Sequence, residues 1–200
     1  MIAVIDYGVG NLFSLTASLK AIGADSVLTG DKAEISRADK IILPGVGAFG
    51  DAKRSLDERG LTDFIIGEAE GGKPLLGICL GMQLLHEASC EYGFCKGLGL
   101  IPGKVGPLRE AANGLKVPAM GWNALKIVKE CPILKYTSDG EYVYYVHSYF
   151  VPKGDYTAAY SEYGVCVSGV TWSKNVFGAQ FHPEKSGNTG LKILEAFKEL

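Results

Sequence analysis

The sequence predicts an α/β fold with a mixed, mostly parallel central sheet flanked by helices and additional antiparallel strands in the second half. In the first half, short apolar runs alternate with segments of helical periodicity, as in the βα units that build parallel sheets. In the second half, β-branched and aromatic runs are separated by Gly, Pro and Asn turns, which favours antiparallel strands. The chain has 200 residues, and we expect a single domain over 1–200, because such a chain can bury about 70 % of its unfolded surface.

The composition is that of an ordinary globular protein, with 47 % hydrophobic and 21 % charged residues. The net charge of −2 argues against a nucleic-acid surface. The sequence contains no run of about 18 apolar residues, so no membrane span is expected. The apolar start at Met1 to Asp6 is too short for a signal peptide.

The cysteines favour a reducing compartment. There are five of them, an odd number, and no Cys-x-x-Cys pair occurs. A disulfide framework or a zinc site is therefore disfavoured, and a cytoplasmic location with no metal and no cofactor is expected.

The first half can be divided into βα units in order. The expected strands are the apolar runs 1–6, 26–29, 40–43 and 74–78. Helical spacing follows at Leu12, Leu15 and Leu19, with Asn11 as a possible cap, and again around Leu56, where Asp51 can cap. Further helices are expected over 61–69 and from 82 onward. Gly8 and Gly10 suggest a dinucleotide fingerprint, but Phe13 occupies the third glycine position, so no nucleotide site is expected.

The second half contains the runs expected to form antiparallel strands. Turn signals separate short segments from residue 97 to 114. The expected strands cover parts of 117–128 and the runs 142–151, 157–160, 166–172 and 176–181, before a final helix with Leu191, Leu194 and Phe197.

Three loops follow the parallel strands directly. They are Tyr7-Gly-Val-Gly10, Pro44-Gly-Val-Gly47 and the turn at Cys79. Because the carboxyl ends of parallel strands share one edge of a sheet, these loops are expected to meet where open α/β sheets place their active sites.

Cys79 stands in a strand–turn–helix segment, Gly77-Ile-Cys-Leu-Gly81. This is the logic of a nucleophile elbow, in which flanking glycines let strand and helix approach closely and the turn exposes the nucleophile. The positive potential of the helix terminus favours negative charge on the sulfur. The pattern alone leaves an inert, buried cysteine as an alternative.

A thiolate nucleophile needs a base and a group that orients the base. Of three histidines, His86 lies two helical turns beyond Cys79 and His147 lies within a Tyr-rich strand. His182 ends a strand before Pro183, and Glu184 follows two residues later, so both side chains can point the same way. Cys79, His182 and Glu184 therefore form a possible catalytic triad, although a strand-end histidine beside a solvated Glu is the alternative.

Gly77-Ile-Cys-Leu-Gly81 together with His182-Pro-Glu184 resembles the signature of class I glutamine amidotransferases. The resemblance implies a flavodoxin-like α/β fold and hydrolysis of glutamine through a γ-glutamyl thioester. It implies that Cys79 is the nucleophile, His182 the base and Glu184 its partner.

The resemblance also implies how the substrate is held. The oxyanion donors would be Leu80 and one N–H of the loop at Val46 or Gly47, with Gly45 helping that loop to reorient. The residues implied to bind glutamine are Gly45, Gln83, Glu91, His147, Ser148 and Tyr149. Without the resemblance, Gln83 and Glu91 would be ordinary surface residues.

Within this family, the segments 6–12, 44–49, 120–123 and 147–149 resemble the glutaminase subunits of imidazole glycerol phosphate synthases. Such subunits form heterodimers with a (β/α)8 barrel cyclase, and no nucleic acid or membrane partner is implied. The residues implied to lie at or near that interface are Asn11, Met120, Trp122 and Lys185. Ala119 departs from the histidine expected before Met120, which concerns the interface and not the triad. The residues alone leave open a different synthase partner, a cysteine peptidase or chaperone, and a non-catalytic interaction module.

Overall fold

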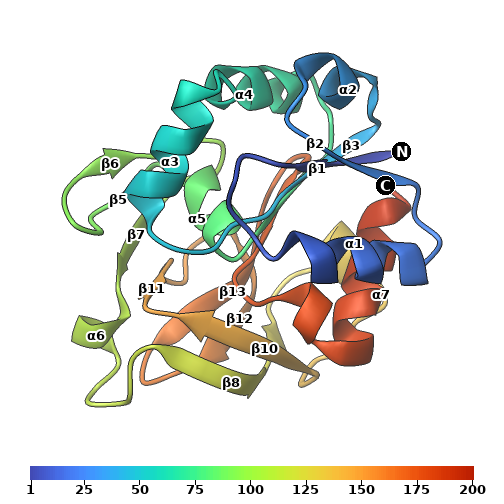
Figure 1. The fold of residues 1–200 in the computed structure, drawn as a ribbon. Helices are drawn as coiled ribbons and strands as arrows, with labels where there is room; N and C mark the ends of the chain where they lie inside the picture. The colour runs from blue at the N-terminus through green and yellow to red at the C-terminus, as the bar shows by residue number, and fades with distance from the viewer.

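The computed structural model describes residues 1–200 and is built around an eight-stranded mixed sheet (Figure 1). The strands of this sheet are β1 (Ile2–Ile5), β2 (Ser26–Thr29), β3 (Lys40–Leu43), β4 (Leu75–Ile78), β9 (Lys126–Ile127), β12 (Thr157–Glu162), β13 (Cys166–Ser173) and β14 (Val176–Ala179). They lie in the order β2-β1-β3-β4-β14-β13-β12-β9.

One half of this sheet is parallel and the other antiparallel. Strands β2, β1, β3, β4 and β14 pair in parallel, whereas β13, β12 and β9 continue the sheet in antiparallel fashion. The pairing of β14 with β4 joins the end of the chain to its middle, with Ala179 opposite Ile78. The residues after β14 therefore emerge beside the residues after β4, as the predicted α/β fold requires.

Helices cover both faces of the sheet (Figure 1). They are α1 (Leu12–Ala21), α2 (Lys32–Arg37), α3 (Phe49–Glu58), α4 (Thr62–Glu70), α5 (Leu80–Leu85), α6 (Leu108–Ala111) and α7 (Gly187–Lys198), with 3-10 turns η1 (Pro132–Leu134) and η2 (Pro183–Lys185). Leu15 of α1 and Phe197 of α7 belong to one buried apolar cluster, and Leu56 of α3 and Leu84 of α5 belong to another. Such two-sided coverage is what a parallel sheet requires, because both of its faces are apolar. None of these helices has the length and apolar character needed to cross a membrane.

Two smaller sheets extend the second half. One has the order β11-β7-β5-β6, formed by β5 (Ala88–Ser89), β6 (Cys95–Lys96), β7 (Lys104–Pro107) and β11 (Tyr149–Phe150), and the other is a ribbon of β8 (Ala119–Ala124) and β10 (Tyr142–His147). The run 142–151 was predicted as a single strand, but it divides at Ser148. The chain changes partner there, because His147 pairs with Ala119 of β8 whereas Tyr149 pairs with Pro107 of β7.

Several helices differ from the sequence predictions in their starts or caps, including α5, which begins at Leu80 and not at residue 82. Asn11 occupies the N-cap position of α1 but makes no side-chain cap bond. The expectation that Asp51 caps a helix is wrong: α3 begins at Phe49, so Asp51 lies in its first turn. Helix α2 was not predicted, because its six residues bury only Ile35 and leave no periodic pattern.

Candidate active site

Cys79 occupies a strained backbone turn between β4 and α5. Its φ of 54° and ψ of −109° lie where non-glycine residues are rarely found. The residue is 7 % exposed and lines a pocket at the end of β4. The nucleophile elbow predicted from Gly77 to Gly81 therefore exists as a backbone conformation.

The flanking glycines are explained by close backbone approach. A Cβ on Gly77 would stand 2.7 Å from the backbone of Gly81, and a Cβ on Gly81 would stand 1.8 Å from the Leu43 carbonyl oxygen. Neither neighbour is the tip of a flexible side chain, so neither can move aside cheaply. The elbow is thus packed against the end of β3 as well as its own strand.

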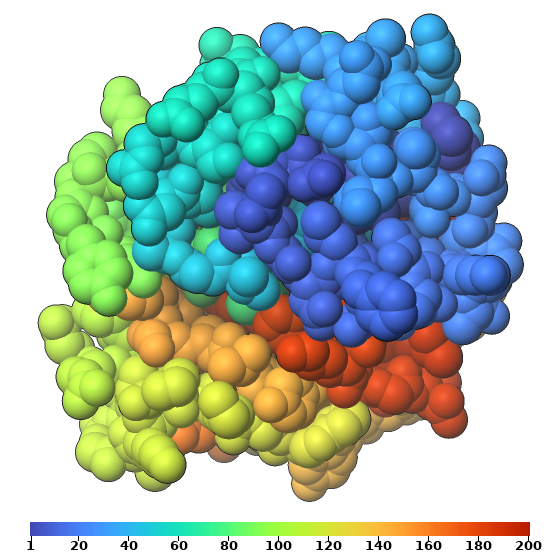
Figure 2. Space-filling view, viewed as in Figure 1, coloured from blue at the N-terminus to red at the C-terminus, as the bar shows by residue number.

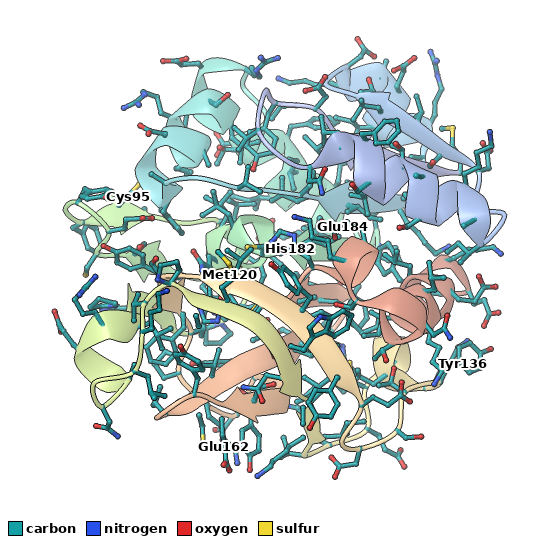
Figure 3. The ribbon with its side chains drawn as sticks, turned by 60° about the horizontal axis from the view of Figure 1, so that its bottom comes forward. Cys95, Met120, Tyr136, Glu162, His182 and Glu184 are labelled. Carbon is teal, nitrogen blue, oxygen red and sulfur yellow. The ribbon has the colours of Figure 1, made fainter.

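His182 and Glu184 come together at the turn that follows β14 (Figure 3). Nδ1 of His182 lies 2.8 Å from Oε1 of Glu184, and each side chain is only 3 % exposed. Burial by itself lowers the pKa of His182, but the nearby Cys79 sulfur and the Glu184 carboxylate outweigh burial and raise the pKa to about 9. A thiolate at Cys79 and a carboxylate at Glu184 thus favour an imidazolium between them.

The Cys79 thiol does not hydrogen bond to His182 in the resting site. Cys79 Sγ lies 3.8 Å from the Val146 carbonyl oxygen, and Gln180 Nε2 lies 3.9 Å from the sulfur. Nε2 of His182 is buried and has no hydrogen-bond partner. In this conformation the Cys79 thiol therefore contacts the Val146 carbonyl and not the His182 ring.

A pocket of about 310 Å³ opens beside the sulfur. Most of the residues predicted to stabilise the oxyanion or to bind glutamine line this pocket, although they come from distant parts of the chain. The lining residues are Val46, Gly47, Cys79, Leu80, Gln83, Glu91, Pro118, Val146, His147, Ser148, Tyr149 and His182. Figure 2 shows the early and late parts of the chain meeting along a line across this view of the molecule. Glu184 is buried behind His182, and Gly45 does not line the pocket.

The polar groups in the pocket are partly engaged with each other. The amide nitrogen of Gln83 is 3.0 Å from both the Tyr149 carbonyl oxygen and Gln180 Oε1, to which it donates. Oε2 of Glu91 accepts the Phe49 N–H at 2.8 Å and so closes the open start of α3. The second oxygen of Glu91 and Oε1 of Gln83 have no protein partner, so they remain acceptors for a ligand.

His147 is a neutral wall of the pocket. Its Nδ1 lies 3.0 Å from the Tyr149 carbonyl oxygen, so Nδ1 carries the hydrogen. Burial and the nearby His182 lower the pKa of His147 to about 4. Nε2 therefore has a free lone pair at neutral pH. The predicted contact residue Ser148 is exposed at the pocket, and its carbonyl accepts the Leu108 N–H.

The loop Pro44 to Gly47 forms the opposite wall. The Leu80 N–H, the first of the predicted oxyanion donors, donates to the Gly45 carbonyl oxygen at 3.3 Å. Val46 is 40 % exposed, and Gly47 has a φ of 94°. In this resting conformation the Leu80 donor is occupied and is not free for a ligand oxygen.

The residues predicted for a partner interface lie on the outer side of the β8–β10 ribbon and next to η2. Met120 is 64 % and Trp122 56 % exposed. The Trp122 ring meets the Tyr144 ring edge to face at 6.0 Å, and Lys185 Nζ lies 6.0 Å from the same ring. Trp122 is therefore a surface residue and not part of the apolar core. Asn11 is half-buried at the start of α1.

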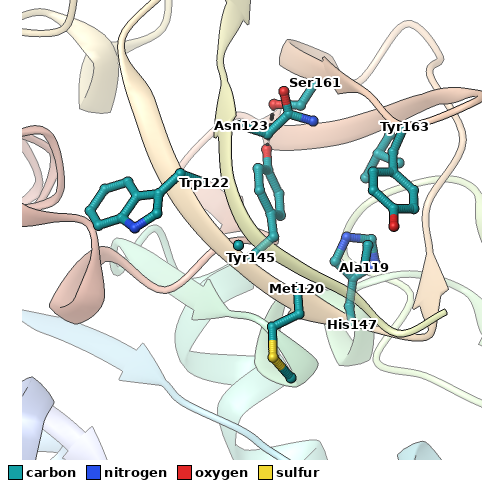
Figure 4. A pocket seen from close by; sticks show the side chains of 10 residues that line it. Ala119, Met120, Trp122, Asn123, Tyr145, His147, Ser161 and Tyr163 are labelled. Atoms are coloured by element: carbon teal, nitrogen blue, oxygen red, sulfur yellow. Dashed lines mark hydrogen bonds between the residues drawn. The ribbon is translucent and has the colours of Figure 1, made fainter. Parts of the chain in front are cut away.

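A second hollow of about 240 Å³ lies under the same ribbon (Figure 4). Ala119, Tyr145, Ser161 and Tyr163 line it, and His147 belongs to both pockets. Tyr145 and Ser161 already hydrogen bond to each other at 2.8 Å. This hollow contains no nucleophile, and the candidate chemistry lies on the Cys79 side of His147.

His86 lies outside both pockets. It is fully buried at the end of α5, where Nδ1 lies 2.7 Å from the Pro102 carbonyl oxygen. Burial lowers the pKa of His86 to about 4. No group of three or more His, Cys, Asp or Glu side chains is arranged to hold a metal ion.

Sequence reasoning missed three residues of this site. Gln180 lies two residues before His182 and contacts both Gln83 and Cys79, and this spacing along the predicted strand was an available signal. Val146 contributes only its carbonyl, which no side-chain pattern reveals. Pro118 reaches the pocket from the start of the ribbon, and nothing in its sequence context indicated this.

Residues 3–199 match the family model described as glutamine amidotransferase class-I. The chain is 53 % identical to "Imidazole glycerol phosphate synthase subunit HisH" of Bacillus licheniformis, over 100 % of this chain and 96 % of the relative. It is 51 % identical to the protein of the same name from Listeria monocytogenes, again over 100 % of this chain and 96 % of the relative.

Solved structures share the fold at low sequence identity. A crystal structure of a glutamine amidotransferase superposes with a TM-score of 0.75 at 18 % identity, with all of both chains covered. The structure of PurLQS from Thermotoga maritima gives a TM-score of 0.71 at 24 % identity, covering 98 % of this chain and 96 % of that chain. These two similarities concern the fold alone.

Proposed function

Because this chain belongs to the class I glutamine amidotransferase family, we propose that it is the glutaminase subunit of an imidazole glycerol phosphate synthase. It hydrolyses glutamine to glutamate and ammonia. The ammonia passes to a cyclase subunit that makes imidazole glycerol phosphate and AICAR in histidine biosynthesis. The names of the relatives support the assignment to this synthase.

The observation that carries the proposal is the meeting of three side chains at one edge of the sheet. Cys79 on its strained elbow and His182 line one pocket, and the buried Glu184 contacts His182 from behind, although about a hundred residues separate Cys79 from the other two. A thiol, an imidazole and an orienting carboxylate are the parts needed for acyl transfer.

Acylation begins when His182 takes the Cys79 proton, which forms a thiolate and an imidazolium. The thiolate attacks the side-chain amide carbon of glutamine. The imidazolium, supported by Glu184, then gives its proton to the leaving nitrogen. Ammonia departs and a γ-glutamyl thioester on Cys79 remains.

Deacylation reverses the use of His182. The imidazole takes a proton from water, the resulting hydroxide attacks the thioester, and glutamate leaves as the thiol is restored. In both steps an oxyanion forms, for which the Leu80 N–H and an N–H of Val46 or Gly47 are the proposed donors. Loss of one such donor typically costs about 10²–10³ in rate. The Gly45 carbonyl must leave Leu80 before both donors can act together.

The remaining pocket residues bind the substrate's amino-acid end. The free oxygens of Glu91 and Gln83 suit the α-ammonium group. Ser148 and Tyr149 offer backbone groups to the α-carboxylate. His147, neutral and with a free Nε2, suits an amide N–H of the side chain. Gly45, which the resemblance grouped with these residues, acts through the loop and not by touching glutamine.

The proposed partner is a (β/α)8 barrel cyclase that forms a heterodimer with this chain. The exposed Met120 and Trp122 rim supports a docking face near the active site, with Asn11 and Lys185 beside it. All five cysteines are free thiols, which supports a cytoplasmic location. We further propose that residues 1–200 act as a single domain.

Glutamate release tests the proposal. The chain alone should hydrolyse glutamine slowly, and addition of the barrel cyclase with its nucleotide ligand should raise turnover strongly. Cys79→Ala should lower stimulated turnover by at least about 10⁴-fold. Cys90→Ala, which changes an exposed thiol away from the pocket, should retain it.

The possible outcomes separate the alternatives. Turnover that persists in Cys79→Ala would refute the thioester mechanism. Stimulation by a different synthase but not by the cyclase would reassign the partner. Cleavage of peptides without glutamine hydrolysis would indicate a peptidase instead.

A further inference from the structure

Tyr7 connects the first loop at the edge of the sheet to the second. Its side chain is fully buried, and its hydroxyl donates to the Pro44 carbonyl oxygen at 2.7 Å. Its own backbone carbonyl accepts the Ser55 hydroxyl of α3. The phenol is therefore fixed at its base and reaches into the loop Pro44 to Gly47.

The inner half of that loop is enclosed between Tyr7 and α5. A Cβ on Gly45 would stand 2.9 Å from the Tyr7 hydroxyl oxygen and 2.8 Å from the Gly81 nitrogen. The Tyr7 hydroxyl makes the one side-chain hydrogen bond to residues 44–47. In this enclosed position the Gly45 carbonyl accepts the Leu80 N–H at 3.3 Å.

The outer half of the loop is free by contrast. Val46 is 40 % exposed, and a Cβ on Gly47 would meet no atom within 4 Å. The loop can therefore turn at its outer residues, while the Tyr7 contact holds its inner residues. Whether the Leu80 N–H is available depends on the inner half.

We propose that Tyr7 is a positioning residue for glutamine hydrolysis: its hydroxyl holds the Pro44 carbonyl and thereby keeps the Gly45 carbonyl on the Leu80 N–H. One oxyanion donor then stays occupied until the partner docks and the loop turns. The inference rests on the proposed function. Tyr7 does not line the glutamine pocket, so it acts through the loop and not on the substrate.

The phenol is suited to this role because it stays protonated. Burial, and then the nearby Cys79 sulfur, raise the pKa of Tyr7 well above its ordinary value. The hydroxyl therefore remains a donor at every pH at which the enzyme works. The Pro44 carbonyl is itself buried, so water does not readily replace the bond.

Tyr7→Phe removes the donor and keeps the ring. We expect kcat of the chain without its partner to rise about five-fold, the factor that corresponds to a net hydrogen bond of about 1 kcal/mol. KM for glutamine and the fully stimulated kcat should stay within about two-fold, so the stimulation ratio should fall about five-fold. An unstimulated kcat that is unchanged or lower would overturn the proposal.

Amide hydrogen exchange gives a readout that needs no glutamine. In the full chain without substrate, the Leu80 amide should exchange about five-fold faster in Tyr7→Phe than in the wild type. Unchanged Leu80 exchange also contradicts the proposal. If the wild-type complex releases no glutamate, the proposed function fails, while Leu80 exchange still tests the Tyr7 contact.

Ser55→Ala is the matched control. It removes the hydrogen bond to the backbone of Tyr7 but leaves the phenol on Pro44. Unstimulated kcat and Leu80 exchange should both stay near wild type, and an increase equal to that of Tyr7→Phe would mean that general loosening is the cause. If Tyr7→Phe does not fold, Tyr7→Met, which also lacks the donor, carries the same expectations.

Discussion

The two walls of the glutamine pocket are built differently. The elbow wall, from Gly77 to α5, is fixed by backbone packed on backbone, with 1.8 Å between a hypothetical Gly81 Cβ and the Leu43 oxygen. The loop wall, from Pro44 to Gly47, is held by one tyrosine hydroxyl and one 3.3 Å backbone contact, and its outer half is exposed. The proposed nucleophile is thus permanently positioned, whereas one half of the proposed oxyanion site can be rearranged.

This difference is consistent with the proposal that glutamine hydrolysis is stimulated by a partner subunit. A fixed nucleophile needs no reorganisation during the reaction, which favours catalysis once the donors are in place. A weakly held loop lets a docking event of modest energy change the rate, since each 1.4 kcal/mol is a factor of ten.

The largest effect expected is that of Gly81→Ala on the elbow wall. The new Cβ would overlap the Leu43 carbonyl, so the start of α5 or the end of β3 must move, at a cost of several kcal/mol in the free energy of unfolding. Gly47→Ala on the loop wall meets open space and should cost about 1–3 kcal/mol for its positive φ alone. Urea unfolding of both variants measures the contrast, and equal losses would mean that the two walls are equally rigid.

Glu184→Gln tests the fixed side of the site without changing its shape. A neutral amide cannot support the imidazolium, so stimulated kcat should fall roughly 10³- to 10⁴-fold. The pKa of His182, raised to about 9 in the wild type, should fall at the same time, which NMR titration of the imidazole detects. Glu162→Gln, which loses a surface ion pair with Lys126, is the control and should retain full activity. A fully active Glu184→Gln would remove Glu184 from the mechanism.

His86 gives a pH test of the far end of the elbow helix. Its pKa is lowered to about 4 when folded, against 6.5 for an ordinary histidine. Between pH 6.5 and about 4 the unfolded chain therefore binds a proton at His86 and the folded chain does not. Stability is lost as pH falls, by on the order of 3 kcal/mol near pH 4. His182 has the opposite sign: its contribution is present below pH 6.5 and is lost as pH rises through about 9.

The measurement is urea unfolding at several pH values between 7 and 4. His86→Asn keeps a donor for the Pro102 carbonyl but cannot be protonated in this range. Unfolding of the variant should therefore take up about one proton fewer than unfolding of the wild type, and its free energy of unfolding should fall less steeply as pH is lowered. His147, which is also buried with a pKa lowered to about 4, remains in both proteins and serves as an internal reference. An identical pH dependence in wild type and variant would show that His86 is not the titrating group.

Local patterns predicted most of the first half of the fold. The apolar runs at β1, β3 and β4 and the turn at Cys79 were predicted because buried parallel strands and an elbow have signals within a few residues. The break at Ser148 was missed, because it depends on which neighbour each strand finds. The start of α3 at Phe49 was missed for a similar reason: Glu91, forty-two residues away, caps it.

Short motifs were enough to identify the candidate reacting groups: the thiol that stands on an elbow, and the histidine that is followed by a carboxylate at the right spacing. The contacts that those groups make in the resting site depend on how distant segments pack. The tertiary structure placed Val146 and Gln180 on the sulfur, put the Gly45 carbonyl on the Leu80 N–H, and set Tyr7 behind the loop. These contacts join backbone groups and buried side chains that are tens of residues apart in the sequence. Such contacts form because separate strands end at the same edge of the sheet, and the periodicity or spacing of residues within one segment does not predict them.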